Sequence, residues 1–153
     1  MKRFLLSCSL LFTLTLFGQR YTNSVGLRFS NIGLTQINAK HYMNASNAVE
    51  VSLGGSTNYI WMQGNYEWQH PLVDDLDYYF GAGPGVGIVS GNPIMQNSAN
   101  DRFMLGANGV IGLEYKLPDY PFTFAIESGP YLQIIPSLSL GWNIGLAARY
   151  VLP

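Results

Sequence analysis

Charge is scarce in this chain. Of its 153 residues only 11% are Asp, Glu, Lys or Arg, and the formal net charge is −1, whereas about a quarter of the residues in an ordinary soluble domain are charged. The chain has a single cysteine, Cys8, and two histidines, which argues against a disulfide framework and a cysteine-based metal site. With a pI near 6.0, it also lacks the basic footprint of a nucleic-acid-binding protein.

Apolar and aromatic residues and glycine make up much of the chain instead. Hydrophobic residues account for 48% of the sequence and aromatic residues for 14%, and there are 17 glycines and 10 tyrosines. The apolar fraction argues against disorder, and the length suits one domain. This composition indicates an aromatic- and glycine-rich β protein whose surroundings are not bulk water alone.

The first 18 residues have the pattern of an export signal. Two basic residues precede an uncharged apolar run over residues 4–17, and Gly18 follows, as in a cleaved secretory signal. A membrane anchor is one alternative, but about 14 apolar residues are short for a spanning helix. Lipidation at Cys8 is another, but the apolar run before it is too short. We expect cleavage after Gly18, which leaves residues 19–153 as the mature domain.

Beyond residue 18 the hydrophobic pattern has a period of two. In residues 142–152 the even positions are Trp, Ile, Leu, Ala, Tyr and Leu, and the odd ones are Asn, Gly, Ala, Arg and Val. Residues 60–70, 78–89 and 103–117 alternate in the same way. A period of two is the pattern of β-strands. It predicts eight strands, over residues 22–31, 34–43, 48–56, 59–70, 77–90, 102–116, 121–132 and 140–152.

The predicted strands are long for a soluble sheet, in which about five or six residues are usual. Their length matches the ~9–11 residues that a tilted strand needs to cross a bilayer, and eight is the smallest strand number usual in outer-membrane barrels. We therefore predict an all-β fold, an eight-stranded antiparallel transmembrane β-barrel. The longest link, residues 91–101, should lie outside the cell, opposite the two termini.

The two faces of the predicted strands differ in charge. Charged residues in strand interiors all lie on the face of small and polar side chains. A soluble sandwich would place its charged face outside, so an apolar outside around a polar lumen explains the pattern better. Buried charges must be paired, and hairpin geometry brings Lys40 close to Glu50. The predicted lumen network consists of Arg28, Lys40, Glu50, Glu67, Glu114, Glu127 and Arg149.

Aromatic residues lie on the apolar face near the strand ends, where a membrane girdle requires them. We also expect His41 and His70, on the same face, to anchor at the lipid headgroups. The more specific alternative for these histidines is a lipid-modifying enzyme that uses His with Ser128 and a carboxylate. The predicted girdle consists of Tyr66, Trp68, Tyr78, Phe80, Tyr115, Trp142 and Tyr150.

Residues 81–87 carry a glycine at every second position, with Pro84 among them. These residues do not form a phosphate loop, because no strand–helix unit follows them. The glycines should make space for inward-facing Trp61 and Tyr79 or bend the sheet. Proline interrupts a strand ladder, so we expect a bulge or bend at Pro84.

Six short segments stand in a recognisable order along residues 26–150: Gly-Leu-Arg-Phe at 26–29, and then 39–43, 65–71, 79–83, 109–116 and 148–150. In this order they resemble small outer-membrane β-barrel proteins of Bacteroidota, barrels of the OmpX and OmpA type. The resemblance covers nearly the whole mature chain. It implies an eight-stranded barrel in outer-membrane lipid, inserted by the barrel-assembly machinery, without enzyme activity.

The sequence thus predicts a non-enzymatic, monomeric outer-membrane barrel with a structural or surface-interaction role and no cofactor. Its lumen should be filled by the Glu/Arg/Lys network, since an eight-stranded barrel is about wide enough for side chains alone. A narrow barrel that conducts ions or a small ligand is one alternative, and a soluble lipocalin-like binding barrel is another. The soluble barrel would need a charged exterior, which this sequence does not supply.

Overall fold

The computed structural model describes residues 22–32, 34–90 and 102–153. The predicted signal peptide and the predicted outer loop 91–101 lie outside the described residues. The chain forms eight strands: β1 (Asn23–Ser30), β2 (Leu34–Tyr42), β3 (Asn47–Ser56), β4 (Tyr59–Val73), β5 (Leu76–Val89), β6 (Arg102–Lys116), β7 (Phe122–Ile135) and β8 (Ser139–Leu152). No helix among the described residues is long and apolar enough to cross a membrane.

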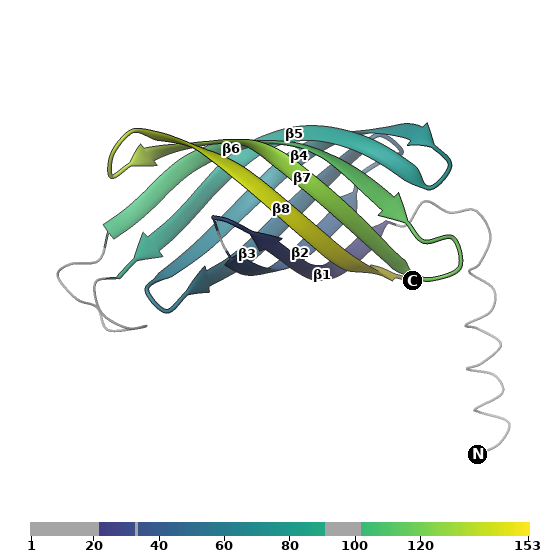
Figure 1. Ribbon diagram of the computed structural model, residues 1–153, viewed down its shortest axis with the longest axis horizontal. Helices are drawn as coiled ribbons and strands as arrows, with labels where there is room; N and C mark the ends of the chain where they lie inside the picture. Colours follow the sequence, from purple (N-terminus) through teal and green to yellow (C-terminus); the bar gives the residue numbers. More distant parts are fainter. Residues whose placement is uncertain (1–21, 33, 91–101) are drawn as a thin grey trace, which may run out of the picture.

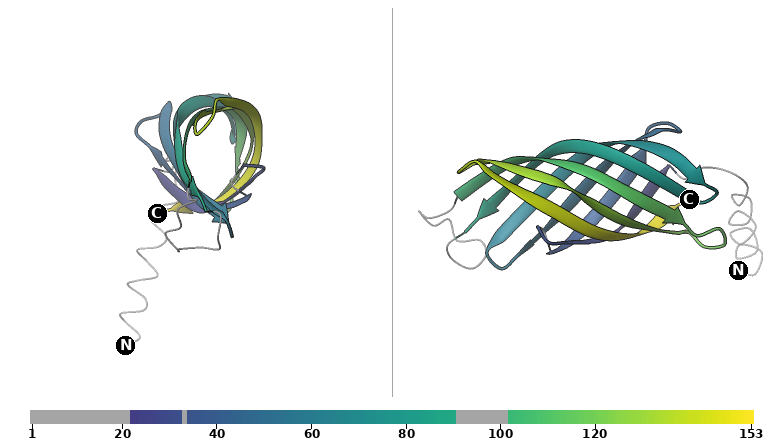
Figure 2. Two further views of the ribbon diagram at one scale, coloured as in Figure 1. Left: turned by 90° about the vertical axis from the view of Figure 1, so that its left-hand side faces the viewer. Right: turned by 45° about the horizontal axis from the view of Figure 1, so that its top comes forward.

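The strands form one closed antiparallel barrel (Figures 1 and 2). Each strand pairs with its neighbour in sequence, and β1 closes the ring against β8, where Asn23 is the register partner of Leu152. The predicted eight-stranded antiparallel barrel is therefore confirmed. The barrel begins and ends at the same end, as an even number of strands requires.

Two predicted strands end later than expected. β4 continues to Val73 and β7 to Ile135, instead of ending at residues 70 and 132. The β4–β5 connection is a tight turn through Asp74 and Asp75, and Asp75 has a φ of 63°. Aspartate tolerates this left-handed conformation because its short side chain can hydrogen-bond locally. A two-residue turn leaves more of the chain for the strands.

Of the bulge or bend predicted at Pro84, the structure contradicts the bulge. The register of β4 against β5 is the same on both sides of the proline: Gln63 pairs with Gly85, and Tyr66 pairs with Ala82. The two residue pairs between these positions are missing from the ladder. Proline has no N–H to donate, so Pro84 interrupts the ladder without shifting its register.

The register also determines the tilt of the strands. The register partners of Gly26 can be followed from strand to strand around the barrel, from β2 to β7, and they lead to Ser139 on β8. The direct partner of Gly26 on β8, however, is Arg149. These two positions are ten residues apart on one strand, which is the shear of the barrel. With about 3.3 Å per residue and about 4.8 Å between strands, this shear tilts the strands about 40° from the barrel axis.

The wall of the barrel is uneven in height. The strands β4 to β8 have 14 or 15 residues, whereas β1, β2 and β3 have 8, 9 and 10. At this tilt each residue advances about 2.5 Å along the axis, so the tall strands rise about 35 Å and the short ones about 20–25 Å. Figures 1 and 2 show β8 continuing well beyond the β1–β2 hairpin.

The barrel has its polar residues inside and its apolar residues outside. Most of its buried residues are polar or charged. Large apolar side chains alternate with them on the outer face: Ile37, Ile111 and Leu146 are each more than half exposed. This arrangement inverts that of a soluble protein, in which apolar side chains fill the interior.

Candidate functional site: the charged lumen

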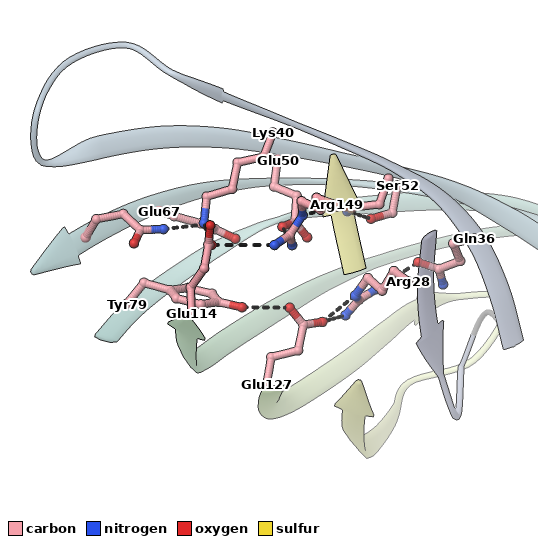
Figure 3. A network of polar contacts seen from close by, with 12 residues as sticks. Arg28, Gln36, Lys40, Glu50, Ser52, Glu67, Tyr79, Glu114, Glu127 and Arg149 are labelled. Carbon is pink, nitrogen blue, oxygen red and sulfur yellow. Dashed lines mark hydrogen bonds and ion pairs between the residues drawn. The ribbon is translucent and has the colours of Figure 1, made fainter. Parts of the chain in front are cut away.

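Each of the eight strands contributes at least one side chain to a buried network in the lumen (Figure 3). The seven residues predicted for the network point inward, and none is more than 3% exposed. The remaining strand, β5, supplies Tyr79, which is fully buried. The residues are Arg28, Lys40, Glu50, Glu67, Tyr79, Glu114, Glu127 and Arg149.

Lys40 lies at the centre of one half of the network. Its Nζ is 2.6 Å from Glu114 Oε2 and 2.9 Å from Glu67 Oε2, and it lies 4.4 Å from the centre of the Tyr79 ring. Glu50 is the register partner of Lys40 on β3, as the hairpin geometry predicted. The ion pairs of Lys40, however, are with β4 and β6.

Arg149 continues this half of the network from β8. Its guanidinium pairs with Glu50 of β3 and donates to Asn38 Oδ1 of β2. Its Nη1 is 3.5 Å from Glu114 Oε2, so Arg149 and Lys40 share one carboxylate oxygen. The Asn38 amide in turn donates to Ser52 Oγ at 2.7 Å.

Arg28 forms the other half of the network. Its guanidinium pairs with Glu127 of β7 and donates from Nη1 to Gln36 Oε1 at 2.8 Å. The Tyr79 hydroxyl donates to the second oxygen of Glu127 at 3.0 Å. Because the Tyr79 ring also contacts Lys40, this residue joins the two halves into one network.

The network therefore pairs the buried charges of the lumen with one another. Each of the four carboxylates contacts at least one of the three cations. Removing one partner of such a buried pair leaves the other charge uncompensated, at a cost of about 3–5 kcal/mol.

Bulky aromatic side chains fill the lumen where glycines leave space. A Cβ at Gly87 of β5 would lie 2.7 Å from the Trp61 ring, and Gly85 faces the same ring, as predicted. The space for Tyr79 comes instead from Gly112 of β6, where a Cβ would lie 2.5 Å from the phenol ring. The prediction that the β5 glycines accommodate Tyr79 is therefore wrong, because Tyr79 reaches across the lumen face of β6.

A pocket of about 510 Å³ lies at the end of the barrel where β1 begins and β8 ends. Glu114 connects it to the network, and Tyr42 and Lys116 also line it, together with the acidic residues of the β4–β5 turn, Asp74 and Asp75. Among the described residues, no group of three or more His, Cys, Asp or Glu side chains could hold a metal ion.

The residues predicted for the girdle all lie on the outer face. Tyr66 is half-buried, and the other six are more exposed. Trp68 stacks on Phe80 with ring centres 5.5 Å apart, and Tyr150 packs edge-on against Phe122 at 5.4 Å. The seven are Tyr66, Trp68, Tyr78, Phe80, Tyr115, Trp142 and Tyr150.

The two histidines and Ser128 have separate partners. His41 Nδ1 is 2.8 Å from Asn23 Oδ1, and His70 stacks on Tyr78 with ring centres 5.1 Å apart. The Ser128 hydroxyl accepts from Trp142 Nε1 at 2.7 Å and donates to a β8 backbone carbonyl at 3.3 Å. The structure therefore does not bring together the serine and histidines of the enzymatic alternative.

Sequence reasoning did not include the uncharged members of the network, among them Gln36, Asn38 and Tyr79. A signal was available for the first two, because they have the same parity on β2 as Lys40 and so must face the lumen. No family model matches this chain, and no match is found among curated proteins.

Proposed function

We propose that this protein is a non-enzymatic integral β-barrel of a bacterial outer membrane, with a lumen closed by its charge network and a structural or surface-interaction role. The observation that carries the proposal is the inverted distribution of polarity. Apolar side chains cover the outside, and the charged side chains of the strand interiors lie inside, paired with one another. Such a surface suits hydrocarbon rather than water.

The dimensions of the outer face support the same proposal. The outward residues of β8 run from Leu140 to Tyr150, ten positions apart, which corresponds to about 25 Å along the axis at the tilt derived above. This is the height of the apolar band in outer-membrane barrels. Trp142 and Tyr150, near the two ends of this band, suit the interfacial girdles.

The ion pairs within the lumen favour a barrel wall over a channel. Arg149, Lys40 and Arg28 contact carboxylates from four other strands, so the side chains reach across the lumen. In this proposal the N-terminal segment is an export signal cleaved after Gly18, the barrel-assembly machinery inserts residues 19–153, and the contacts of the mature monomer are with outer-membrane lipid.

Gel migration of the membrane fraction with and without boiling tests both location and closure. We expect the protein to fractionate with the outer membrane and to migrate differently before and after boiling, because a closed barrel resists detergent until it is heated. Mass analysis of the purified protein should give a chain that starts at Gln19. Recovery in the soluble fraction would favour the lipocalin-like barrel, and an acylated chain that starts at Cys8 would make the protein a lipoprotein.

A further inference from the structure

The pocket at the end of the barrel where β1 begins and β8 ends, called the turn pocket below, has a surplus of negative charge. Asp74, Asp75 and Asp77 line it, and Lys116 is the one basic residue in its described lining. None of the ion pairs among the described residues involves the three aspartates. The turn pocket is therefore suited to a positively charged group.

The walls of the turn pocket combine carboxylates with apolar carbon. The backbone N–H of Lys116 donates to Asp75 O at 2.8 Å, which ties the β4–β5 turn to β6. Leu72 and Val73 line the same pocket beside the aspartates. An arginine fits such walls, because its methylene stem packs on apolar surface while its guanidinium binds carboxylates with two parallel hydrogen bonds.

The lumen network behind the turn pocket is also short of positive charge. Glu114 belongs to both, since it lines the pocket and pairs with Lys40. The network contains four carboxylates and three cations, and Glu50 Oε1 and Glu67 Oε1 are buried without a hydrogen-bond partner among the described residues. Uncompensated buried charge is costly. This surplus is independent of the three aspartates and favours the same kind of ligand.

The mature chain has one basic residue without an assigned place, Arg20. Of the eight lysines and arginines, two lie in the predicted signal and three in the lumen network. Arg102 begins β6 at the opposite end of the barrel, and Lys116 already lines the turn pocket. Arg20 remains, two residues after Gly18. Cleavage there would place it next to the new N-terminus.

The start of β1 brings Arg20 within reach of the turn pocket. The Tyr42 N–H donates to Thr22 O at 2.8 Å, and Tyr42 lines the pocket. A sphere of 510 Å³ is about 10 Å across, and the two residues from Thr22 back to Arg20 span up to about 7 Å before the side chain begins. Figure 1 shows the β4–β5 turn at the same end as the C-terminus. A tether this short raises the local concentration to the millimolar range.

We propose that the turn pocket binds the guanidinium of Arg20 through Asp74, Asp75 and Asp77. The occupant is thus the N-terminal segment of this chain, residues 19–21, which lies outside the described residues. The inference rests on the proposed function, because removal of the export signal leaves this segment as the chain end. Docking holds the start of β1 against the β4–β5 turn, which is distant in sequence.

The test measures how fast each arginine reacts with phenylglyoxal in the mature protein, purified from the membrane fraction into detergent micelles. Mass mapping follows each site, and exposed Arg102 is the internal reference. We expect Arg20 to react about tenfold more slowly than Arg102, because only the undocked segment reacts. Molar NaCl should reduce this difference, since salt screens partly exposed ion pairs.

Two sets of variants separate the turn pocket from the general charge of the barrel end. Asp74→Asn combined with Asp77→Asn keeps the shape of the side chains and should raise the rate at Arg20 to that at Arg102. Asp119→Asn is the control, because Asp119 is exposed in the β6–β7 turn and does not line the pocket. It should leave Arg20 slow. All variants should keep the wild-type difference in gel migration before and after boiling.

Four results would overturn the inference. The first is equal rates at Arg20 and Arg102 in the wild type. The second is a slow Arg20 that the paired aspartate changes do not accelerate, and the third is an equal acceleration by Asp119→Asn. The fourth is acceleration of Arg20 by low-millimolar Ca²⁺ that NaCl of the same ionic strength does not reproduce, which would make the occupant a divalent cation. Loss of heat-dependent migration in the wild type would instead count against the proposed function, whatever the rate at Arg20.

Discussion

Arg28 of β1 and Glu127 of β7 form an ion pair although β8 lies between their strands. The pair therefore crosses the seam at which the first strand closes on the last. Arg149 crosses the same seam in the opposite direction, from β8 past β1 and β2 to Glu50 of β3. Both arginines link strands that are far apart in sequence. The lumen network therefore helps to hold the first strand of the barrel against the last, in addition to occupying the interior.

The ion pair of Arg149 across the β1–β8 seam predicts that Arg149→Ala strongly lowers the stability of the barrel. The change leaves Glu50 without its ion-pair partner in the lumen, and we expect the free energy of unfolding to fall by about 3–5 kcal/mol. Urea titration in lipid measures it. Arg102→Ala is the control, because Arg102 is exposed at the start of β6. Equal effects of the two changes would mean that the network does not stabilise the barrel.

The outward face of β8 predicts that Leu146→Arg is poorly tolerated. Leu146 is 56% exposed near the middle of the strand, and an arginine at the midplane of a barrel costs about 2–4 kcal/mol. Ala147→Ser, on the lumen face, should be milder. The same titration ranks the two changes, and the opposite ranking would contradict a lipid environment for this face.

The packing of Trp61 predicts a difference between two glycines of neighbouring strands. A Cβ at Gly85 would overlap the Trp61 ring, which Tyr131 holds edge-on at 5.4 Å. Gly85→Ala should therefore destabilise the barrel by about 1–3 kcal/mol. At Gly64 the nearest atom to an added Cβ is 3.9 Å away, so Gly64→Ala should be nearly neutral. Thermal unfolding in micelles compares them, and equal losses would contradict a packed lumen.

The proposed closure of the lumen predicts almost no current through the wild-type protein in planar bilayers. Lys40 is within ion-pair distance of Glu67 and Glu114, so ions would have to displace buried pairs to pass. The alternative, a narrow channel, predicts a steady, charge-selective conductance. Such a conductance, altered by Glu114→Gln with little loss of stability, would favour that alternative.

The sequence alone was sufficient to predict the strands and their faces. A period of two places every second side chain on one face, so the parity of Lys40, Glu50 and Arg149 placed them together inside before any contact was known. The number of strands followed from the same pattern. Only their ends were misplaced, as at Val73, because two residues are enough for the turn that follows.

The tertiary structure decided which charges pair and which residues line the turn pocket. Lys40 is beside Glu50 in the local register, yet its ion pairs are with Glu67 and Glu114. The turn pocket likewise takes its walls from β2, β4, β5 and β6. These features follow from the shear, which accumulates over all eight hairpin and seam registers and is fixed only when the sheet closes. A local pattern determines which face a side chain occupies, but closure determines what it meets across the lumen.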